Sequence, residues 1–314
     1  MPSGAEGVGV VVLAYGAGGR HEELLRGLLG EGVPAGSILL VHNPARPGEA
    51  PPQPPPGCEL LQADRNLGYA GGMNLGLERQ RRSGCELILL LTHDARLGRG
   101  GFNALVAAAR RQPRFGAIGP LLNRADNGAR FSCGGITRAN GTNAHLAEPR
   151  PVEGGIAPCD WVDGGTMVVR AEAVERAGAF DERFWGYCEE ADLCLRFRRA
   201  GFAVGVAVDA VAEQDPGGPR RPGAWAYLLT RNGAAYAWRA AGIRGALTIE
   251  LRAAWLTLSS VARAALRLVR HRPGGPAEPW AVAVGTARGA IDFLRGRWGP
   301  PPPGLPGMGD VGNA

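Results

Sequence analysis

The sequence has 314 residues, of which 45% are hydrophobic, so the chain is long enough to bury a full core and is not disordered as a whole. Its net charge is +6 and all 35 of its strongly basic residues are arginines, which alone is weak support for nucleic-acid binding, and we predict no nucleic-acid partner. No stretch reaches the roughly 18 apolar residues of a membrane-spanning helix, and the six cysteines form no C-x-x-C pair, so we expect free thiols and a cytoplasmic protein.

Strand-like and helix-like segments alternate over the first 120 residues. The continuous apolar run "VGVVVLAY" at 8–15 is typical of a strand buried on both faces, whereas the spaced leucines of 21–32 are typical of a helix. Further strands are predicted over 37–43, 58–64, 86–94 and 115–122, and further helices over 70–84 and 101–113. This alternation predicts an α/β fold with a doubly wound, mostly parallel sheet, whose ligands bind beyond the carboxyl ends of the strands.

The strand at 86–94 ends in a carboxylate. Five apolar residues, 87–91, run into Thr92, His93 and Asp94. Asp94 therefore occupies the position at which a parallel sheet presents ligand-binding groups.

Two glycine-rich stretches are candidates for a nucleotide-binding site. "GAGGR" after the first strand lacks the third glycine of a dinucleotide fingerprint, because position 21 is His21. "NLGYAGGMNLGL" at 66–77 instead places several glycines and two asparagines between a strand and a helix, where backbone can approach a phosphate closely.

A compact block at 178–207 contains an acidic helix. We predict this helix from Glu189 to Ala200, with Leu193 and Phe197 on one face, an ion pair between Asp192 and Arg196, and Gly201 ending it. Between this block and the predicted sheet, residues 121–170 read as Gly- and Asn-rich loops with short strands.

The C-terminal segment is helical and rich in arginine, leucine and tryptophan. One helix is predicted over 230–272 and a second over 278–299, followed by a disordered tail at 299–314. Arg252, Arg263, Arg267 and Arg270 fall within one arc of the first helix. Such helices can lie on an anionic membrane surface, or they can pack against the first domain or a partner subunit, and the sequence leaves both readings open.

Four stretches together resemble the family-2 glycosyltransferases with the GT-A fold. "NLGYAGGMNLG" is similar to that family's N-x-G-[FY]-A-x-G-x-N-x-G signature, and "LLLTHDA" lies where the family has its acidic metal motif. "GAFDERFWGYCEEADLCLR" resembles the block that carries the catalytic base, and "YLLTRNGAAYAWR" is similar to the Arg-Asn helix of the rhamnosyltransferase-like branch. The four occur in the family's order between residues 8 and 240.

This resemblance implies an inverting transfer of a sugar, with a rhamnose-like deoxyhexose favoured, from a dTDP- or UDP-linked donor to an acceptor hydroxyl. The acceptor would be a glycan, a lipid-linked sugar or a metabolite of the cell envelope. It also implies a GT-A domain over 1–240, a basic helical extension over 241–298 and the tail at 299–314. The location would be cytoplasmic, with the inner face of the membrane as a peripheral site.

The resemblance also implies roles for individual residues. Glu190 would be the catalytic base and Asp94 the ligand of Mg²⁺ or Mn²⁺. The donor would be bound by Ala14, Tyr15, His42, Asn43, Asn66, Gly68, Gly71, Asn74, Thr92 and His93. The acceptor would be bound by Gly164, Gly165, Trp185, Glu189 and Asp192, with secondary roles for Gln214, Arg231 and Asn232.

Three positions depart from the family pattern. Glu190 stands where the family commonly has aspartate, Gln214 where a metal-binding histidine is common, and His42 where an aspartate often reads the nucleotide base. These departures leave a second hypothesis, in which a degenerate GT-A domain binds nucleotide sugar or glycan without turnover.

Overall fold

The computed structural model describes residues 6–16, 20–214, 221–269 and 277–306. The chain divides into two compact units. The first comprises Met1–Ile136, Ala144–Asp181 and Glu190–Pro216, and the second comprises Thr137–Asn143, Glu182–Glu189 and Gly217–Ala314. The predicted boundary between residues 240 and 241 falls at a bend within one helix of the second unit.

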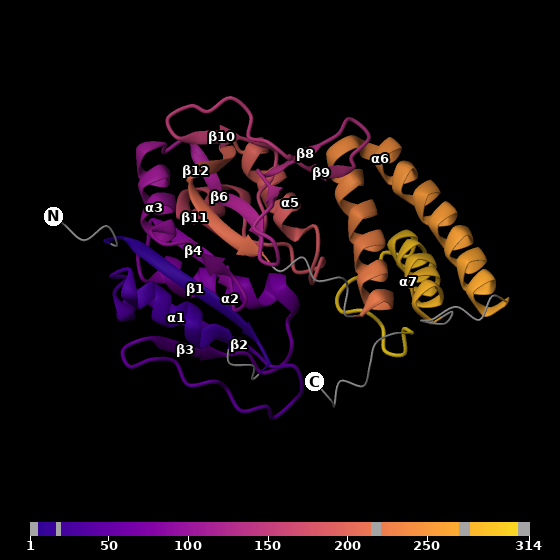
Figure 1. The fold of residues 1–314 in the computed structure, drawn as a ribbon, viewed down its shortest axis with the longest axis horizontal. Helices are drawn as coiled ribbons and strands as arrows, with labels where there is room; N and C mark the ends of the chain where they lie inside the picture. The colour runs from indigo at the N-terminus through magenta and orange to yellow at the C-terminus, as the bar shows by residue number, and fades with distance from the viewer. Residues whose placement is uncertain (1–5, 17–19, 215–220, 270–276, 307–314) are drawn as a thin grey trace. The chain divides into compact units, whose positions relative to one another are not determined.

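A large mixed sheet forms the centre of the first unit (Figure 1). Its main path runs β10-β12-β6-β11-β4-β1-β2-β3, with β5 paired to β12 and β7 paired to β6. The strands are β1 (Val8–Tyr15), β2 (Ile38–Asn43), β3 (Glu59–Gln62), β4 (Leu87–Thr92), β5 (Arg96–Leu97), β6 (Phe115–Arg124), β7 (Arg130–Ser132), β10 (Ile156–Pro158), β11 (Thr166–Arg170) and β12 (Ala203–Gln214). A separate two-stranded sheet joins β8 (Gly135–Thr137) to β9 (Asn143–His145).

The predicted mostly parallel sheet is confirmed, with β11 running against its neighbours in the middle of the sheet and β5, β7 and β10 each antiparallel to its partner strand. β1 pairs in parallel with β2 and β4, and β12 pairs in parallel with β6. β11 lies between β4 and β6 and is antiparallel to both. Because β11 runs backwards, its first residue, Thr166, pairs with Leu91 at the carboxyl end of β4. The segment before β11 therefore reaches the edge of the sheet at which Asp94 lies.

Helices on both faces explain why the central strands are apolar throughout. In β1, Val10 and Val12 join one core cluster with Leu25 of α1 (Arg20–Gly30). That cluster also includes Phe102 and Leu105 of α3 (Gly101–Arg111). The short helix α4 (Ala171–Ala177) follows β11, and a 3-10 turn, η1 (Ala35–Ser37), precedes β2.

The opposite face of β1 receives the glycine-rich side of α2 (Gly68–Arg82). An ideal Cβ on Gly72 would lie 2.6 Å from a methyl group of Leu13, and one on Gly76 would lie 2.3 Å from a methyl group of Val11. These two glycines therefore serve close packing of a helix on a strand, and the helix starts at Gly68, two residues before its predicted start.

The acidic helix is confirmed as α5 (Glu189–Arg199). Leu193 and Phe197 are both fully buried on its inner face. Arg196 Nε donates to Asp192 Oδ2 over 2.8 Å, as the i,i+4 spacing predicts. Gly201 has a φ of 91°, in the left-handed region that glycine favours after a helix.

The second unit consists mainly of α6 (Pro222–Val269) and α7 (Ala277–Leu294). The predicted helix over 230–272 is present up to residue 269, beyond which its last residues lie outside the described ones. α6 starts earlier than predicted and bends at Ala241 and Gly242, where Gly242 has a φ of 64°. The bend reverses the course of the helix, and the two arms diverge from it (Figure 1). Next to the bend they lie close, since a Cβ on Gly245 would lie 2.2 Å from the Ala237 carbonyl oxygen. α7 packs as closely, since a Cβ on Gly285 would lie 2.1 Å from the Gly223 carbonyl oxygen.

Part of the predicted tail packs on the helices. Leu305 is 7% exposed and forms a small core cluster with Tyr227 and Leu228. Residues 307–314 lie outside the described residues.

The contact between α2 and β1 yields a stability test. We expect Gly76→Ala to lower the free energy of unfolding by about 1–3 kcal/mol, because the added methyl group must displace Val11. Gly27→Ala in α1 is the matched control: it meets no atom within 4 Å and should raise stability by up to about 1 kcal/mol through helix propensity. Urea denaturation measures both, and equal effects of the two substitutions would contradict the packing role.

Candidate functional site

The turn after β4 presents Asp94 to solvent. Thr92 N–H donates to the Gly165 carbonyl oxygen at 3.0 Å, and Ala95 N–H donates to the Thr92 carbonyl oxygen at 2.9 Å. These bonds fix a tight turn over Thr92–Ala95, and Asp94 at its corner is exposed. The carboxylate predicted to hold a metal is thus accessible at the end of a central strand.

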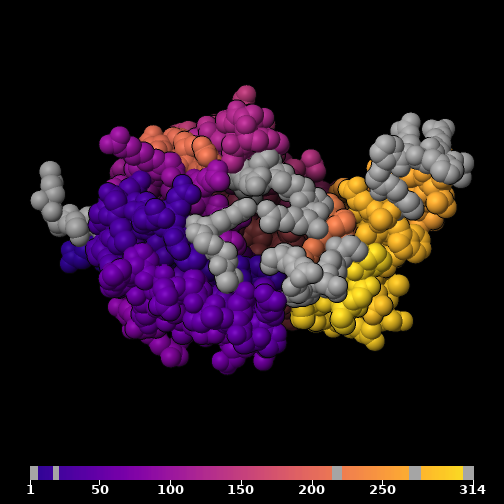
Figure 2. Space-filling model, turned by 60° about the horizontal axis from the view of Figure 1, so that its bottom comes forward, coloured from indigo at the N-terminus to yellow at the C-terminus, as the bar shows by residue number. Residues whose placement is uncertain are grey.

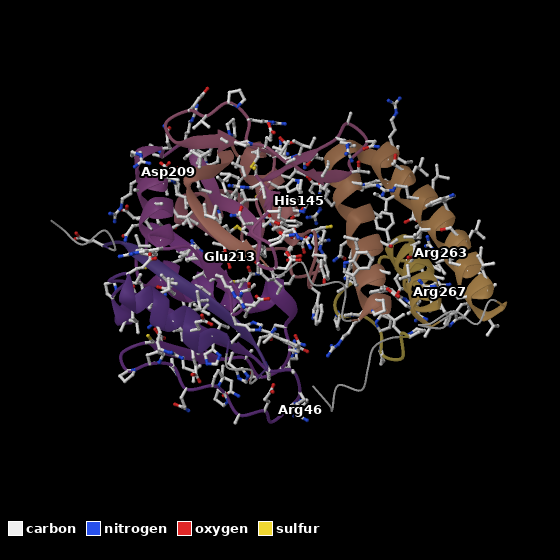
Figure 3. The ribbon with its side chains drawn as sticks, in the orientation of Figure 1. Arg46, His145, Asp209, Glu213, Arg263 and Arg267 are labelled. Carbon is white, nitrogen blue, oxygen red and sulfur yellow. The ribbon has the colours of Figure 1, made fainter. Side chains whose placement is uncertain are left out.

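Asp94 and His93 line a cavity of about 600 Å³ in the first unit. Glu23 of α1, Glu31 directly after it and Glu213 of β12 also line the cavity (Figure 3 labels Glu213). Arg96 is the one arginine in its lining. Four carboxylates and a single arginine make this cavity acidic. Among the described residues, no group of three or more His, Cys, Asp or Glu side chains is arranged to hold a metal ion.

Glu190 stands at the start of α5 in a desolvated position. An ideal Cβ on Gly164 would lie 3.5 Å from the Glu190 Cβ, so the segment before β11 packs directly against this side chain. Burial, together with the nearby charge of Asp163 and against backbone hydrogen bonds that lower it, raises the pKa of Glu190 to about 7. Among the described residues, Glu190 Oε2 has no hydrogen-bond partner. A carboxylate with this pKa and a free oxygen is suited to accept a proton near neutral pH.

Asp163, whose charge acts on Glu190, belongs to a group of three side chains that was not predicted from the sequence. Ser132 Oγ lies 3.1 Å from Asp163 Oδ2, and His145 Nδ1 lies 2.9 Å from the same Ser132 oxygen. His145 Nδ1 also lies 3.9 Å from Asp163 Oδ2, so β7, β9 and the segment before β11 meet here (Figure 3 labels His145). We call Ser132, His145 and Asp163 the polar triplet. The one sequence signal was Asp163 itself, a carboxylate placed directly before two glycines.

The loop before α5, in the second unit, has an unusual backbone. Trp185, Tyr187 and Cys188 have φ values of 64°, 67° and 68°, in the left-handed region that side chains other than glycine rarely adopt. Each such residue costs on the order of 1–3 kcal/mol, so the surroundings must hold the loop in place.

Arg231 and Asn232 of α6 hold the loop in this conformation through hydrogen bonds. Asn232 Nδ2 lies within 3.0 Å of the carbonyl oxygens of Phe184, Gly186 and Tyr187. Arg231 Nη2 donates to the Phe184 carbonyl oxygen at 3.2 Å, and its Nε donates to Asn232 Oδ1 at 2.9 Å. Both residues are fully buried.

A buried polar network extends from Arg231 to α7. Arg231 Nη1 donates to the Tyr227 hydroxyl, which donates to Asp292 Oδ2, both over 3.1 Å. Burial lowers the pKa of Arg231 and raises that of Tyr227. Asp292 also pairs with Arg288 at 3.5 Å, so every charge of the network faces a partner.

The asparagines of the predicted donor motif bond to the protein itself. Asn43 Oδ1 accepts from Leu67 N–H at 2.8 Å, and Asn66 Oδ1 accepts from Gly68 N–H at 2.9 Å, so both cap the start of α2. Asn74 exchanges two hydrogen bonds with the backbone of Phe180, at 2.9 and 3.0 Å. These three side chains build the frame of the site, and donor contact through them stays a prediction.

The remaining predicted residues differ in accessibility. Tyr15 is 36% exposed at the end of β1, whereas His42 is fully buried and burial lowers its pKa. Asp192 is also fully buried, in its pair with Arg196. Gln214 ends β12 in register with Arg124, and its side chain lies outside the described residues. Ala14, Gly68, Gly71 and Glu189 are buried, while Asn66, Thr92, His93, Gly164, Gly165 and Trp185 are half-buried.

The comparisons with known proteins agree with this geometry. No family model matches the chain. The chain is 29% identical over 219 residues to N-acetylglucosaminyl-diphospho-decaprenol L-rhamnosyltransferase of Mycobacterium tuberculosis, covering 62% of this chain and 71% of that protein. It is 27% identical over 164 residues to the low-salt glycan biosynthesis hexosyltransferase Agl10 of Haloferax volcanii, covering 49% of this chain and 51% of that protein.

A solved structure supports the fold. The crystal structure of GalNAc-T7 with UDP, GalNAc and Mn²⁺ superposes with a TM-score of 0.52 at 10% identity, over 70% of this chain and 47% of that one. The predicted GT-A architecture and the predicted resemblance to rhamnosyltransferases are confirmed by these similarities.

The hold on the strained loop can be tested by stability. We expect Asn232→Ala to lower the free energy of unfolding by about 1–3 kcal/mol, because it leaves buried carbonyl groups without donors. Leu229→Ala, at a 40% exposed position on the same helix, should stay within about 0.5 kcal/mol of the parent. Chemical denaturation of both variants measures this, and an equally small loss for Asn232→Ala would show that the loop does not depend on it.

Proposed function

We propose that this glycosyltransferase moves a rhamnose-like deoxyhexose from a dTDP- or UDP-linked donor to a hydroxyl of a glycan or lipid-linked acceptor, with inversion at the anomeric carbon. The observation that carries the proposal is Glu190, a desolvated carboxylate with a free oxygen and a pKa of about 7. The M. tuberculosis relative is, by name, a rhamnosyltransferase that acts on a diphospho-decaprenol-linked sugar, which supports both substrate classes.

Glu190 would act as the general base. Its carboxylate accepts the proton of the acceptor hydroxyl as that oxygen forms a bond to the anomeric carbon, and the bond from that carbon to the diphosphate oxygen breaks. Gly164 has no side chain to crowd this carboxylate: an ideal Cβ there would lie 3.5 Å from the Glu190 Cβ and 2.8 Å from the Tyr69 hydroxyl. A single base on one face agrees with inversion.

A divalent cation fits the acidic cavity at Asp94. Mg²⁺ and Mn²⁺ prefer oxygen ligands, and Mg²⁺ is typically held by one or two protein carboxylates together with substrate phosphates. A nucleoside diphosphate close to four carboxylates would be repelled without such an ion. When bound, the ion would neutralise charge on the leaving diphosphate. Asp94 is the residue we propose to hold it, with His93 beside it.

Binding without turnover is the alternative function. The similarity to proteins named as rhamnosyl- and hexosyltransferases favours the enzyme. A transfer assay decides between them.

We expect Glu190→Gln to lower the transfer rate by about a hundredfold or more, because general-base catalysis is typically worth that much. In the parent enzyme the base must be ionised, so activity should fall as the pH drops below the Glu190 pKa of about 7.

Asp94→Asn should weaken the response to Mn²⁺ and Mg²⁺ while Glu190→Gln leaves it intact. Rates with dTDP- and UDP-sugars against pH and metal concentration measure these effects. Full activity of Glu190→Gln would refute the base assignment, and donor binding without transfer by the parent would favour the binding module.

We also propose that the outer arm of α6, residues 243–269, rests on an anionic membrane surface. Its inward face is made of small buried residues, namely Ala246, Ala253, Ser260 and Ala264. Its outward face carries large exposed apolar side chains, which at 100° per residue share one broad arc. They are Ile243, Leu247, Leu251, Trp255, Leu258, Val261, Leu266 and Leu268, between 41% and 72% exposed.

The charge of this arm favours a membrane over a second copy of the chain. It contains four arginines and one glutamate, and Arg252 and Arg263 border the apolar arc (Figure 3 labels Arg263 and Arg267). An antiparallel two-fold pair of such arms would place like arginine rows side by side, whereas anionic headgroups would meet them favourably. Figure 2 shows one face of these helices in orange and yellow. Among the described residues, no helix is both long and apolar enough to cross a membrane, so the arm would lie in the interface.

The membrane contact has a direct test. Leu258→Glu places a charge at a 72% exposed apolar position and should weaken binding to phosphatidylglycerol vesicles about tenfold or more. Val152→Glu, at a 47% exposed position in the first unit, is the control and should bind as the parent does. Co-sedimentation at low and high salt gives the affinity. Equal binding of both variants, or a dimer that only Leu258→Glu dissociates in light scattering, would reject the membrane in favour of other partners.

A further inference from the structure

The strongest unassigned cluster in the first unit is the polar triplet, Ser132, His145 and Asp163. Ser132 is fully buried, and its hydroxyl lies within hydrogen-bond distance of both other members. Its oxygen can also accept from Gly134 N–H at 3.2 Å, and its proton has two acceptors within reach, Asp163 Oδ2 at 3.1 Å and the Gly134 carbonyl oxygen at 3.2 Å, of which the carboxylate is the charged one. The bonds thus form a chain from His145 through Ser132 to the Asp163 carboxylate.

Aromatic packing fixes the outer end of this chain. The His145 ring lies 4.8 Å from the Phe131 ring and 4.9 Å from the Trp161 ring, measured between centroids. The His145 side chain is 38% exposed, whereas that of Asp163 is 15% exposed. The chain therefore runs from a half-exposed imidazole to a sheltered carboxylate.

Asp163 is a neighbour of the base and has like charge. Gly164, the next residue, packs against Glu190, and the charge of Asp163 favours the protonated form of Glu190. Burial raises the pKa of Asp163, while His145 and the hydrogen bond from Ser132 lower it. Two carboxylates in one desolvated site do not ionise independently, since each charge opposes the other.

Resting on the proposed function, we propose that Asp163 is a positioning residue for the base: held by Ser132 and His145, its charge makes Glu190 a stronger proton acceptor for the acceptor hydroxyl. His145 and Ser132 stabilise the ionised form of Asp163, which burial alone would disfavour. None of the three touches the reacting atoms in this scheme, so their effect passes through Glu190.

The other ionisable groups around this site do not change the assignment of the charge effect on Glu190 to Asp163. The Tyr69 hydroxyl of α2 donates to the Gly164 carbonyl oxygen at 2.5 Å. The Cys194 thiol of α5 has a pKa raised to about 12 by burial and stays neutral near pH 7. Arg198, on the same helix, pairs with Asp160 at 3.3 Å. In the neighbouring chain segment, Glu189 precedes the base directly.

The test is the pH dependence of acceptor turnover in Asp163→Asn. Removing the like charge should move the acid limb of the kcat/KM profile by about one pH unit to lower pH. The plateau above the limb should fall by a few-fold, because Glu190 becomes a weaker base. Donor binding, measured by calorimetry, should stay as in the parent. Asp163→Ser removes the same charge and serves if the Asn variant does not fold.

Asp209→Asn is the matched control, with the same change of charge at an exposed position of β12 in the same unit (Figure 3 labels Asp209). Its acid limb should coincide with that of the parent. An unmoved limb in Asp163→Asn, or an equal shift in Asp209→Asn, would overturn the inference. Absence of transfer by the parent enzyme would instead refute the proposed function, so the two failures are distinguishable.

Discussion

The antiparallel strand β11 is the constraint on which the candidate site depends. A sheet of parallel strands alone would gather only strand ends at its ligand-binding edge. Because β11 enters that edge from the opposite direction, it delivers Asp163, Gly164 and Gly165 there as well. Gly165 then accepts a hydrogen bond from Thr92, and Gly164 makes room for Glu190. One reversed strand thus links the end of β4 to the start of α5.

Desolvation has different consequences for Glu190 in the first unit and for Arg231 in the second. In the first, Glu190 is half-buried, with one buried oxygen that no described residue satisfies, so its proton affinity rises toward the value a base needs. In the second, Arg231 is buried with a complete set of acceptors around it, so its charge stabilises structure rather than chemistry. The difference between a reactive and a structural buried charge here is whether its hydrogen bonds are complete.

Much of the fold followed from local pattern. The apolar runs predicted β1 and β4, because a strand buried on both faces is apolar throughout. The i,i+4 spacing of opposite charges predicted α5, because such residues lie side by side on a helix. The site was harder to predict. Asn43 and Asn66 matched a ligand motif yet cap a helix, and the polar triplet joins residues up to 31 positions apart through pairings that no periodicity encodes. The bend at Gly242 was not predicted, because a glycine inside a helical pattern does not by itself predict a turn.

The left-handed backbone at Trp185, Tyr187 and Cys188 sets stability against function in this loop. Glycine would adopt these angles without strain, so a search for a more heat-resistant enzyme should readily accept it there. The same change would widen the range of conformations open to the chain just before its base. Thermostability screens that do not measure turnover would therefore select glycine at these three positions and loosen the loop.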